Sequence, residues 1–157
     1  MMNERSVRLD RMRYTKNTAS SRLALLAIVF DVLYFVGLYR INVDYYYTLM
    51  MGASILYNLV FMLAAFLSSE GVKNYKQGYS LVLCALGAIQ IARIFILPVR
   101  AHATAVTAGG AEIMAMSDAQ FTRAVIELVA SAVCLFASAA VNLKKSRALK
   151  AHGAGLE

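Results

Sequence analysis

The chain has no tryptophan, one proline, two cysteines and two histidines among its 157 residues. Because Pro98 is the only proline, long helices can run without a break. Cys84 and Cys134 lack CxxC spacing and have no histidine near them, so they are interpreted as small apolar packing residues. There is no paired nucleophile and base, histidine cluster or glycine-rich phosphate loop. We therefore predict no catalytic residue, metal or cofactor, and a protein that is not an enzyme.

Charge is also scarce: 16% of the residues are charged and 60% are hydrophobic, whereas soluble domains are about a quarter charged and half apolar. Four apolar runs cover residues 22–38, 48–67, 80–97 and 121–143. Each approaches the roughly 20 helical residues that a bilayer core requires. The sequence predicts an all-α membrane protein, a four-transmembrane-helix bundle over residues 22–143. Thr18, Ser20 and Ser21 are candidate N-caps of its first helix.

The net charge of +7 would suggest a nucleic-acid partner in a soluble protein. Here most of the basic residues lie on one side of the apolar runs, so we expect contact with membrane lipid and no nucleic acid. One side holds the arm 1–21, the loop after the second run and the tail 144–157, with Arg5, Arg8, Arg11, Arg13, Lys16, Arg22, Lys73, Lys76, Lys144, Lys145, Arg147 and Lys150. The other side has Arg40 and Arg100, with Arg123 at its edge. Positive residues stay cytoplasmic, which predicts a multi-pass protein of the plasma or inner membrane with both termini inside.

Two segments fall on the predicted outer side. The first, between the first two runs, carries Tyr39, Tyr45, Tyr46 and Tyr47, a pattern typical of an aromatic belt at headgroup level. The second, residues 98–120, is too long for a simple turn and contains Gly109-Gly110. A glycine pair suits a tight hairpin turn, so we predict a small β-hairpin there.

Charged residues inside apolar runs are costly and usually have a partner or a function. The three are Asp31, Arg93 and Glu127, in the first, third and fourth runs. Counting about 1.5 Å per residue puts them roughly 10, 6 and 9 Å below the outer edge, at a similar level. We hypothesise that these three residues form an internal or inter-subunit polar contact.

Three further residues belong to this candidate site. Arg123 lies one turn from Glu127, Gln90 lies one turn below Arg93, and Asn58 lies near the middle of the second run. Three interpretations remain open: an interhelical ion-pair network that fixes packing, a polar cavity that binds a solute or proton, and a contact with a partner's membrane helix.

Three stretches resemble a family of uncharacterised small membrane proteins of Gram-positive bacteria: NERSVRLDRMRY at 3–14, YNLVFMLAAFLSSEGVKNY at 57–75 and RIF at 93–95. The resemblance spans nearly the whole chain and is associated with sugar-type ABC importers. It names no active site. It implies a subunit that lies beside an importer's permease.

Small size, absent catalytic motifs and scattered polar residues favour a non-enzymatic accessory or scaffolding subunit of a larger membrane complex, with a permease-type partner. The alternative is a small homo-oligomeric transporter of a polar or cationic solute that uses intramembrane carboxylates. Asp31 is superficially similar to the single essential acid of four-helix multidrug exporters. Arg93 weakens that alternative, because a proton-coupled carboxylate is best left unpaired by a fixed cation.

Overall fold

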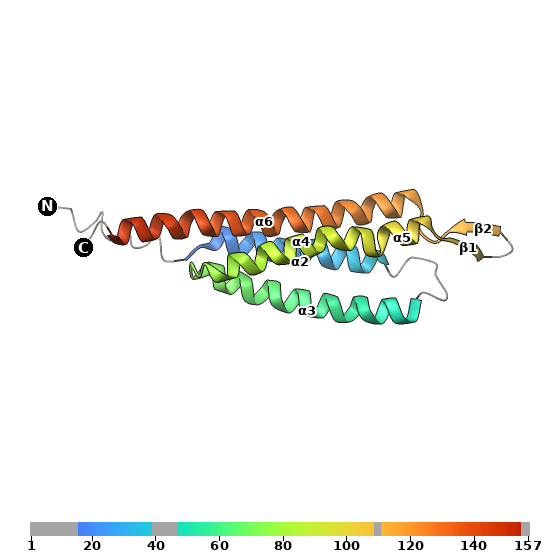
Figure 1. Cartoon of the computed structure of the whole chain (residues 1–157), viewed down its shortest axis with the longest axis horizontal. Helices are drawn as coiled ribbons and strands as arrows, with labels where there is room; N and C mark the ends of the chain where they lie inside the picture. Colours follow the sequence, from blue (N-terminus) through green and yellow to red (C-terminus); the bar gives the residue numbers. More distant parts are fainter. Residues whose placement is uncertain (1–15, 39–46, 109–110, 155–157) are drawn as a thin grey trace.

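The computed structural model describes residues 16–38, 47–108 and 111–154, and it is dominated by four long helices (Figure 1). These are α2 (Thr18–Leu38), α3 (Tyr47–Lys73), α4 (Gly78–Ile96) and α6 (Asp118–Ala154). A short helix, α5 (Pro98–Ala103), and two strands, β1 (Ala105–Ala108) and β2 (Ala111–Met114), connect α4 to α6. The four long helices are long and apolar enough to cross a membrane, as the sequence predicts, and they indicate a multi-pass membrane protein.

The four helices form an up-and-down bundle in which α6 is the principal packing partner. It packs along α2 and α4, whereas α3 packs on α2 and α4 and barely meets α6. Thus α2 and α4 lie on one diagonal and α3 and α6 on the other, consistent with the opposite positions of α3 and α6 in Figure 1. We call the end with the α3–α4 turn the basic end, and the end with the strands the hairpin end.

The bundle buries more polar side chains, and exposes more large apolar ones, than a soluble bundle does. Serine, asparagine and glutamine side chains are buried between the helices, together with Asp31 and Arg93. Leucine, isoleucine and valine side chains point outward on every long helix: Leu56 is 65% exposed and Leu81 is 78% exposed. Lipid favours this arrangement, because apolar surface gains nothing by leaving lipid while polar groups must find partners.

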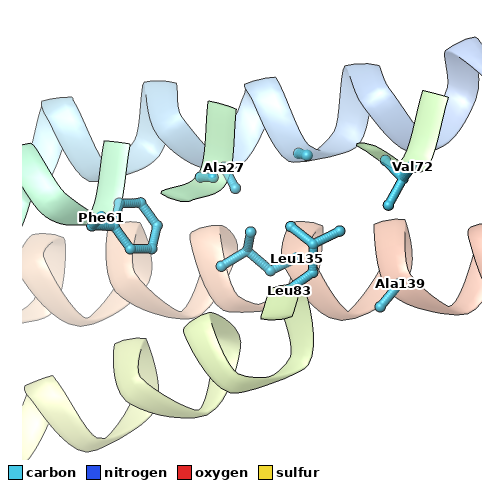
Figure 2. Close-up of a cluster of buried hydrophobic side chains, with 8 residues drawn as sticks. Ala27, Phe61, Val72, Leu83, Leu135 and Ala139 are labelled. Atoms are coloured by element: carbon cyan, nitrogen blue, oxygen red, sulfur yellow. The ribbon is translucent and has the colours of Figure 1, made fainter. Parts of the chain in front are cut away.

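Small residues allow close packing in the half of the bundle nearer the basic end. Figure 2 shows the apolar cluster there, with Ala27, Phe61, Leu83, Leu135 and Ala139. All four long helices contribute to this cluster. A second cluster at the hairpin end gathers around Tyr34, Met116 and Leu128, so two apolar layers lie above and below the level of Arg93.

The helix ends are set by local hydrogen bonds that differ in part from the predicted ones. The Asn17 side chain, rather than Thr18, Ser20 or Ser21, caps α2 by accepting a hydrogen bond from the Ser20 amide, 3.4 Å from its Oδ1. At the start of α6, Ser117 and Gln120 form a reciprocal capping box: the Ser117 amide donates to Gln120 Oε1 at 3.0 Å and the Gln120 amide to Ser117 Oγ at 3.4 Å.

The α3–α4 turn is a Schellman motif, with the Lys76 amide bonded to the Gly71 carbonyl and the Tyr75 amide to the Val72 carbonyl. Tyr75 occupies the left-handed position, φ 58°, that glycine usually takes.

Helix lengths depart most from prediction in α6, which spans 37 residues. The predicted tail 144–157 is helical as far as Ala154, because its Lys, Arg and Ala residues are good helix formers even outside an apolar run. At about 1.5 Å per residue, the part beyond Leu143 adds roughly 16 Å. The predicted arm 1–21 is described only from Lys16 onward, and the tyrosine-rich segment 39–46 lies outside the described residues.

The strand pairing of the predicted β-hairpin is confirmed. Strands β1 and β2 are antiparallel, with Ala105 opposite Met114 and Ala108 opposite Ala111. The Gly109-Gly110 turn lies outside the described residues. The Ala115 amide continues the ladder to the Thr104 carbonyl at 2.9 Å, and Met116 is 1% exposed, which anchors the base of a hairpin that projects beyond the helices (Figure 1).

Gly71 and Gly78 provide a matched test of packing at the α3–α4 turn. A Cβ on Gly71 would overlap the Tyr79 ring, whereas one on Gly78 would meet nothing within 4 Å. We expect Gly71→Ala to lower the free energy of unfolding by about 1–3 kcal/mol. Gly78→Ala should be neutral or stabilising by up to about 1 kcal/mol. Unfolding by SDS titration from mild detergent checks both, and equal effects would contradict this packing.

Candidate functional site: a charged layer joining four helices

A layer of buried polar side chains joins the four long helices, and we call it the charged layer. Its members are Asp31, Asn58, Gln90, Arg93 and Ser131, and the Arg93 guanidinium on α4 is its centre. Its Nη1 donates to Asp31 Oδ1 on α2 at 2.8 Å, across the diagonal of the bundle. Its Nη2 donates to Asn58 Oδ1 on α3 at 2.7 Å and, more weakly, to Ser54 Oγ at 3.4 Å. Arg93 is 7% exposed and Asp31 1%, so this is a buried, charge-assisted contact.

Gln90, one turn from Arg93 on α4, connects this pair to α6. Its Nε2 donates to Asp31 Oδ1 at 2.9 Å and to Ser131 Oγ at 3.2 Å. The Ser131 hydroxyl in turn donates to the Ala27 carbonyl on α2 at 3.0 Å. Each long helix therefore contributes a polar side chain to the layer, and Asp31 Oδ1 receives hydrogen bonds from both Arg93 and Gln90.

Two tyrosine rings cover the guanidinium. The Arg93 Cζ lies 4.6 Å from the centroid of the Tyr34 ring and 4.3 Å from that of Tyr57. Cation–π attraction is strongest where water is excluded, so these rings stabilise the buried charge on faces that carry no hydrogen-bond acceptor. Neither tyrosine stood out in the sequence, because aromatic residues at helical spacing are ordinary in an apolar run.

The layer is not fully satisfied. Four buried polar atoms around Arg93 have no partner in the described part of the chain: Asp31 Oδ2, Asn58 Nδ2 and the hydroxyls of Tyr34 and Tyr57. Buried polar atoms usually find a protein or water partner. Ordered water molecules are therefore the expected hydrogen-bond partners of these four atoms.

Glu127 does not join Arg93, contrary to the three-residue contact hypothesised from sequence. Its Oε1 accepts a hydrogen bond from Arg123 Nε at 2.8 Å, one turn away on α6. Residues four apart on a helix lie on one face, and Arg123 is near enough to neutralise the acid locally. Of the six candidate residues, Asp31, Asn58, Gln90 and Arg93 therefore form one network, and Arg123 and Glu127 form a separate pair.

A second polar layer, at the basic end, was not predicted. Asn142 on α6 donates to Ser80 Oγ on α4 at 2.8 Å and accepts from Asn17 Nδ2 at 3.2 Å. The backbone N–H of Asn17 donates to the Lys73 carbonyl at the end of α3, at 2.8 Å. Groups from all four long helices, or from the residue that caps α2, therefore meet in this layer too.

Two serine pairs lie next to this layer. Ser20 and Ser138 each donate to the other's carbonyl, at 2.6 and 2.7 Å, and Ser21 lies 2.8 Å from Ser69, hydroxyl to hydroxyl. The pattern in the sequence that could have indicated these contacts is the spacing of Ser131, Ser138 and Asn142, at intervals of seven and four, which puts them on one face of α6.

The described residues contain no group of three histidine, cysteine, aspartate or glutamate side chains that could hold a metal ion. Comparisons with protein-family models, with curated proteins and with solved structures find no match to the chain. The fold and the site together define a multi-pass four-helix bundle whose deepest charges are paired with one another inside it.

A double-mutant cycle tests the Asp31–Arg93 pair. Arg93→Leu and Asp31→Leu each leave a buried charge without its partner, so each should reduce the free energy of unfolding by about 3–5 kcal/mol. The double variant should lose clearly less than the sum. Glu70→Gln is the matched control, because Glu70 pairs with Lys73 at the surface, where a pair contributes about 0–1 kcal/mol. Additive losses at Asp31 and Arg93 would contradict the pairing.

Proposed function

We propose that this protein is a non-enzymatic integral membrane subunit that acts by binding a larger membrane complex. The observation that carries the proposal is the internal neutralisation of Asp31 by the Arg93 guanidinium, with a further hydrogen bond from Gln90. A carboxylate held by a fixed guanidinium is poorly suited to exchange protons or cations. This arrangement supports the packing interpretation of the charged layer over the alternative of a homo-oligomeric transporter that works through Asp31.

The charge distribution supports an orientation with the basic end in the cytoplasm. At that end the described residues include Lys16, Arg22, Lys73, Lys76, Lys144, Lys145, Arg147 and Lys150. Their only acidic neighbour in a described ion pair is Glu70, on Lys73. At the hairpin end the lysines and arginines among the described residues are Arg100 and Arg123. The positive-inside rule then leaves both termini inside and the hairpin outside a plasma or inner membrane.

The partner we propose is a permease-type subunit of a sugar-type ABC importer. The resemblance of residues 3–14, 57–75 and 93–95 to small Gram-positive membrane proteins supports this class. Two projections suit such a role: the hairpin extends beyond the helices at one end and α6 extends past the α3–α4 turn at the other (Figure 1). In the proposed orientation these elements reach the substrate side and the ATPase side of an importer.

Native mass spectrometry after mild extraction at native expression tests the partner. With a tag after α6, we expect a complex of fixed stoichiometry that contains a permease and an ATPase. The matched variant Arg93→Leu should lower the yield of the complex, because the bundle is destabilised. A homo-oligomer that carries nothing else would contradict the accessory role and support the transporter alternative.

Cysteine accessibility tests the orientation. In a Cys84→Ser/Cys134→Ser background, Ala103→Cys and Ala151→Cys introduce single thiols at exposed alanines on opposite ends. A membrane-impermeant maleimide should label the Ala103→Cys protein in intact cells. The Ala151→Cys protein should react only after permeabilisation. The reverse pattern would place the basic end outside.

A further inference from the structure

The end of α6 is held against the α3–α4 turn by one of its faces, and it continues past that turn (Figure 1). Three residues four apart on α6 donate hydrogen bonds to the turn, each at 3.2 Å: Asn142 and Ser146 to backbone carbonyls, and Lys150 to the Gln77 side chain. Asn142 and Ser146 are buried. We call these three residues the braced face. They keep the end of α6 in line with the part that can cross a membrane.

The opposite face of the same segment is exposed. Lys144, Arg147, Ala148 and Ala151 follow one another at spacings of three, one and three, which puts them on one side of the helix, and all four are exposed. We call these four residues the free basic face. It carries two cations at its start and two alanines beyond them, and the small alanine side chains allow another chain to approach the helix closely.

The positive charge of this face is not balanced within the described part of the chain. No acidic residue follows Glu127 on α6, and neither Lys144 nor Arg147 forms an ion pair with a described residue. Like charges this close on one helix are unfavourable. The helix dipole favours cations only in the last turn, which lies beyond both residues. The braced face therefore holds in place a helix whose charge suits a partner of opposite sign.

A protein surface fits this face better than lipid headgroups do. The headgroup layer is about 5–8 Å deep on each side of a bilayer, whereas the helix rises roughly 12 Å from Leu143, the last residue of its apolar run, to Ala151. Basic helices that bind lipid lie flat in the interface, but the braced face keeps this one upright. A protein beside the helix can cover the whole free basic face, and headgroups can cover only its start.

We propose that the free basic face docks an acidic segment of a cytoplasmic protein. The carboxylates of that segment lie at Lys144 and Arg147, where the guanidinium can bind one of them through two parallel hydrogen bonds, and its backbone lies beside Ala148 and Ala151. The inference rests on the proposed function in one respect, the cytoplasmic position of the basic end. It does not depend on which membrane complex the protein joins.

Photocrosslinking in intact cells tests where the segment docks. Benzoylphenylalanine in place of Ala148 or Ala151 puts a reactive ketone on the free basic face, and in place of Leu149, which is half-buried, it puts one on the braced side of the helix. We expect the Ala148 and Ala151 adducts to contain a peptide of a cytoplasmic protein that is rich in aspartate and glutamate, with a several-fold lower yield from Leu149. No adduct, adducts with lipid alone, or an equal yield from Leu149 would overturn the proposal.

Two paired charge removals test the chemistry of the contact. Lys144→Gln/Arg147→Gln should lower the yield of the Ala148 adduct roughly fivefold, because two exposed charge pairs are lost. Glutamine has nearly the helix propensity of lysine and arginine, so the end of α6 stays helical. The matched control Lys16→Gln/Lys76→Gln removes the same charge from exposed residues at the same end and should leave the yield unchanged. Equal yields in the two variants would overturn the assignment of this face.

A charge swap shows whether the contact is direct. Lys144→Glu/Arg147→Glu should lose the adduct, and lysines in place of the acids of the crosslinked peptide should restore it in that variant alone. Failure to restore it would overturn direct pairing. A crosslinked protein that is not the ATPase of an importer would contradict the partner proposed above and support this inference. The cysteine labelling reports the orientation by itself, so the two proposals fail separately.

Discussion

The bundle depends on the burial of one guanidinium, that of Arg93, among groups from all four long helices. Asp31 of α2 accepts a hydrogen bond from the guanidinium across one diagonal, and Asn58 and Ser54 of α3 accept two more. Gln90 donates to both Asp31 and Ser131, which connects α6 to the same layer. In lipid, apolar faces provide little preference for one helix rotation over another. A buried charge does provide one, because each alternative rotation would leave an ion without partners at a cost of several kcal/mol.

The two apolar clusters and the second polar layer are consistent with that constraint. Close contact of α2 and α6 requires small residues, and these two helices bury Ala24, Ala27, Ala132 and Ala139. Asn17 and Asn142 then hold the helices together at the basic end. With its interior closed in this way, the molecule can interact through its apolar outer faces and its two projecting ends.

Much of the fold was predictable from the sequence, and less of the site. The number of long helices followed from run length, the hairpin followed from Gly109-Gly110, and the common level of Asp31 and Arg93 followed from counting along helices. Rotation about each helix axis could not be predicted, because runs that are apolar all round show no periodicity. For this reason Glu127 was expected beside Arg93, although its nearest cation is one turn away on its own helix. Uncharged Ser138 and Asn142 were overlooked because serine and asparagine cost less in an apolar run than a charge does.

The most direct measurement of the central claim is the distance between the Asp31 carboxylate and the Arg93 guanidinium in a lipid bilayer. Solid-state NMR dephasing between ¹³Cγ of aspartate and ¹⁵Nη of arginine reports this contact, and an Arg93→Lys sample removes its contribution. The structure predicts strong dephasing at Asp31, as a 2.8 Å N–O contact requires, and its loss in Arg93→Lys. Identical dephasing in the two samples would contradict the claim that this pair joins the bundle across its diagonal.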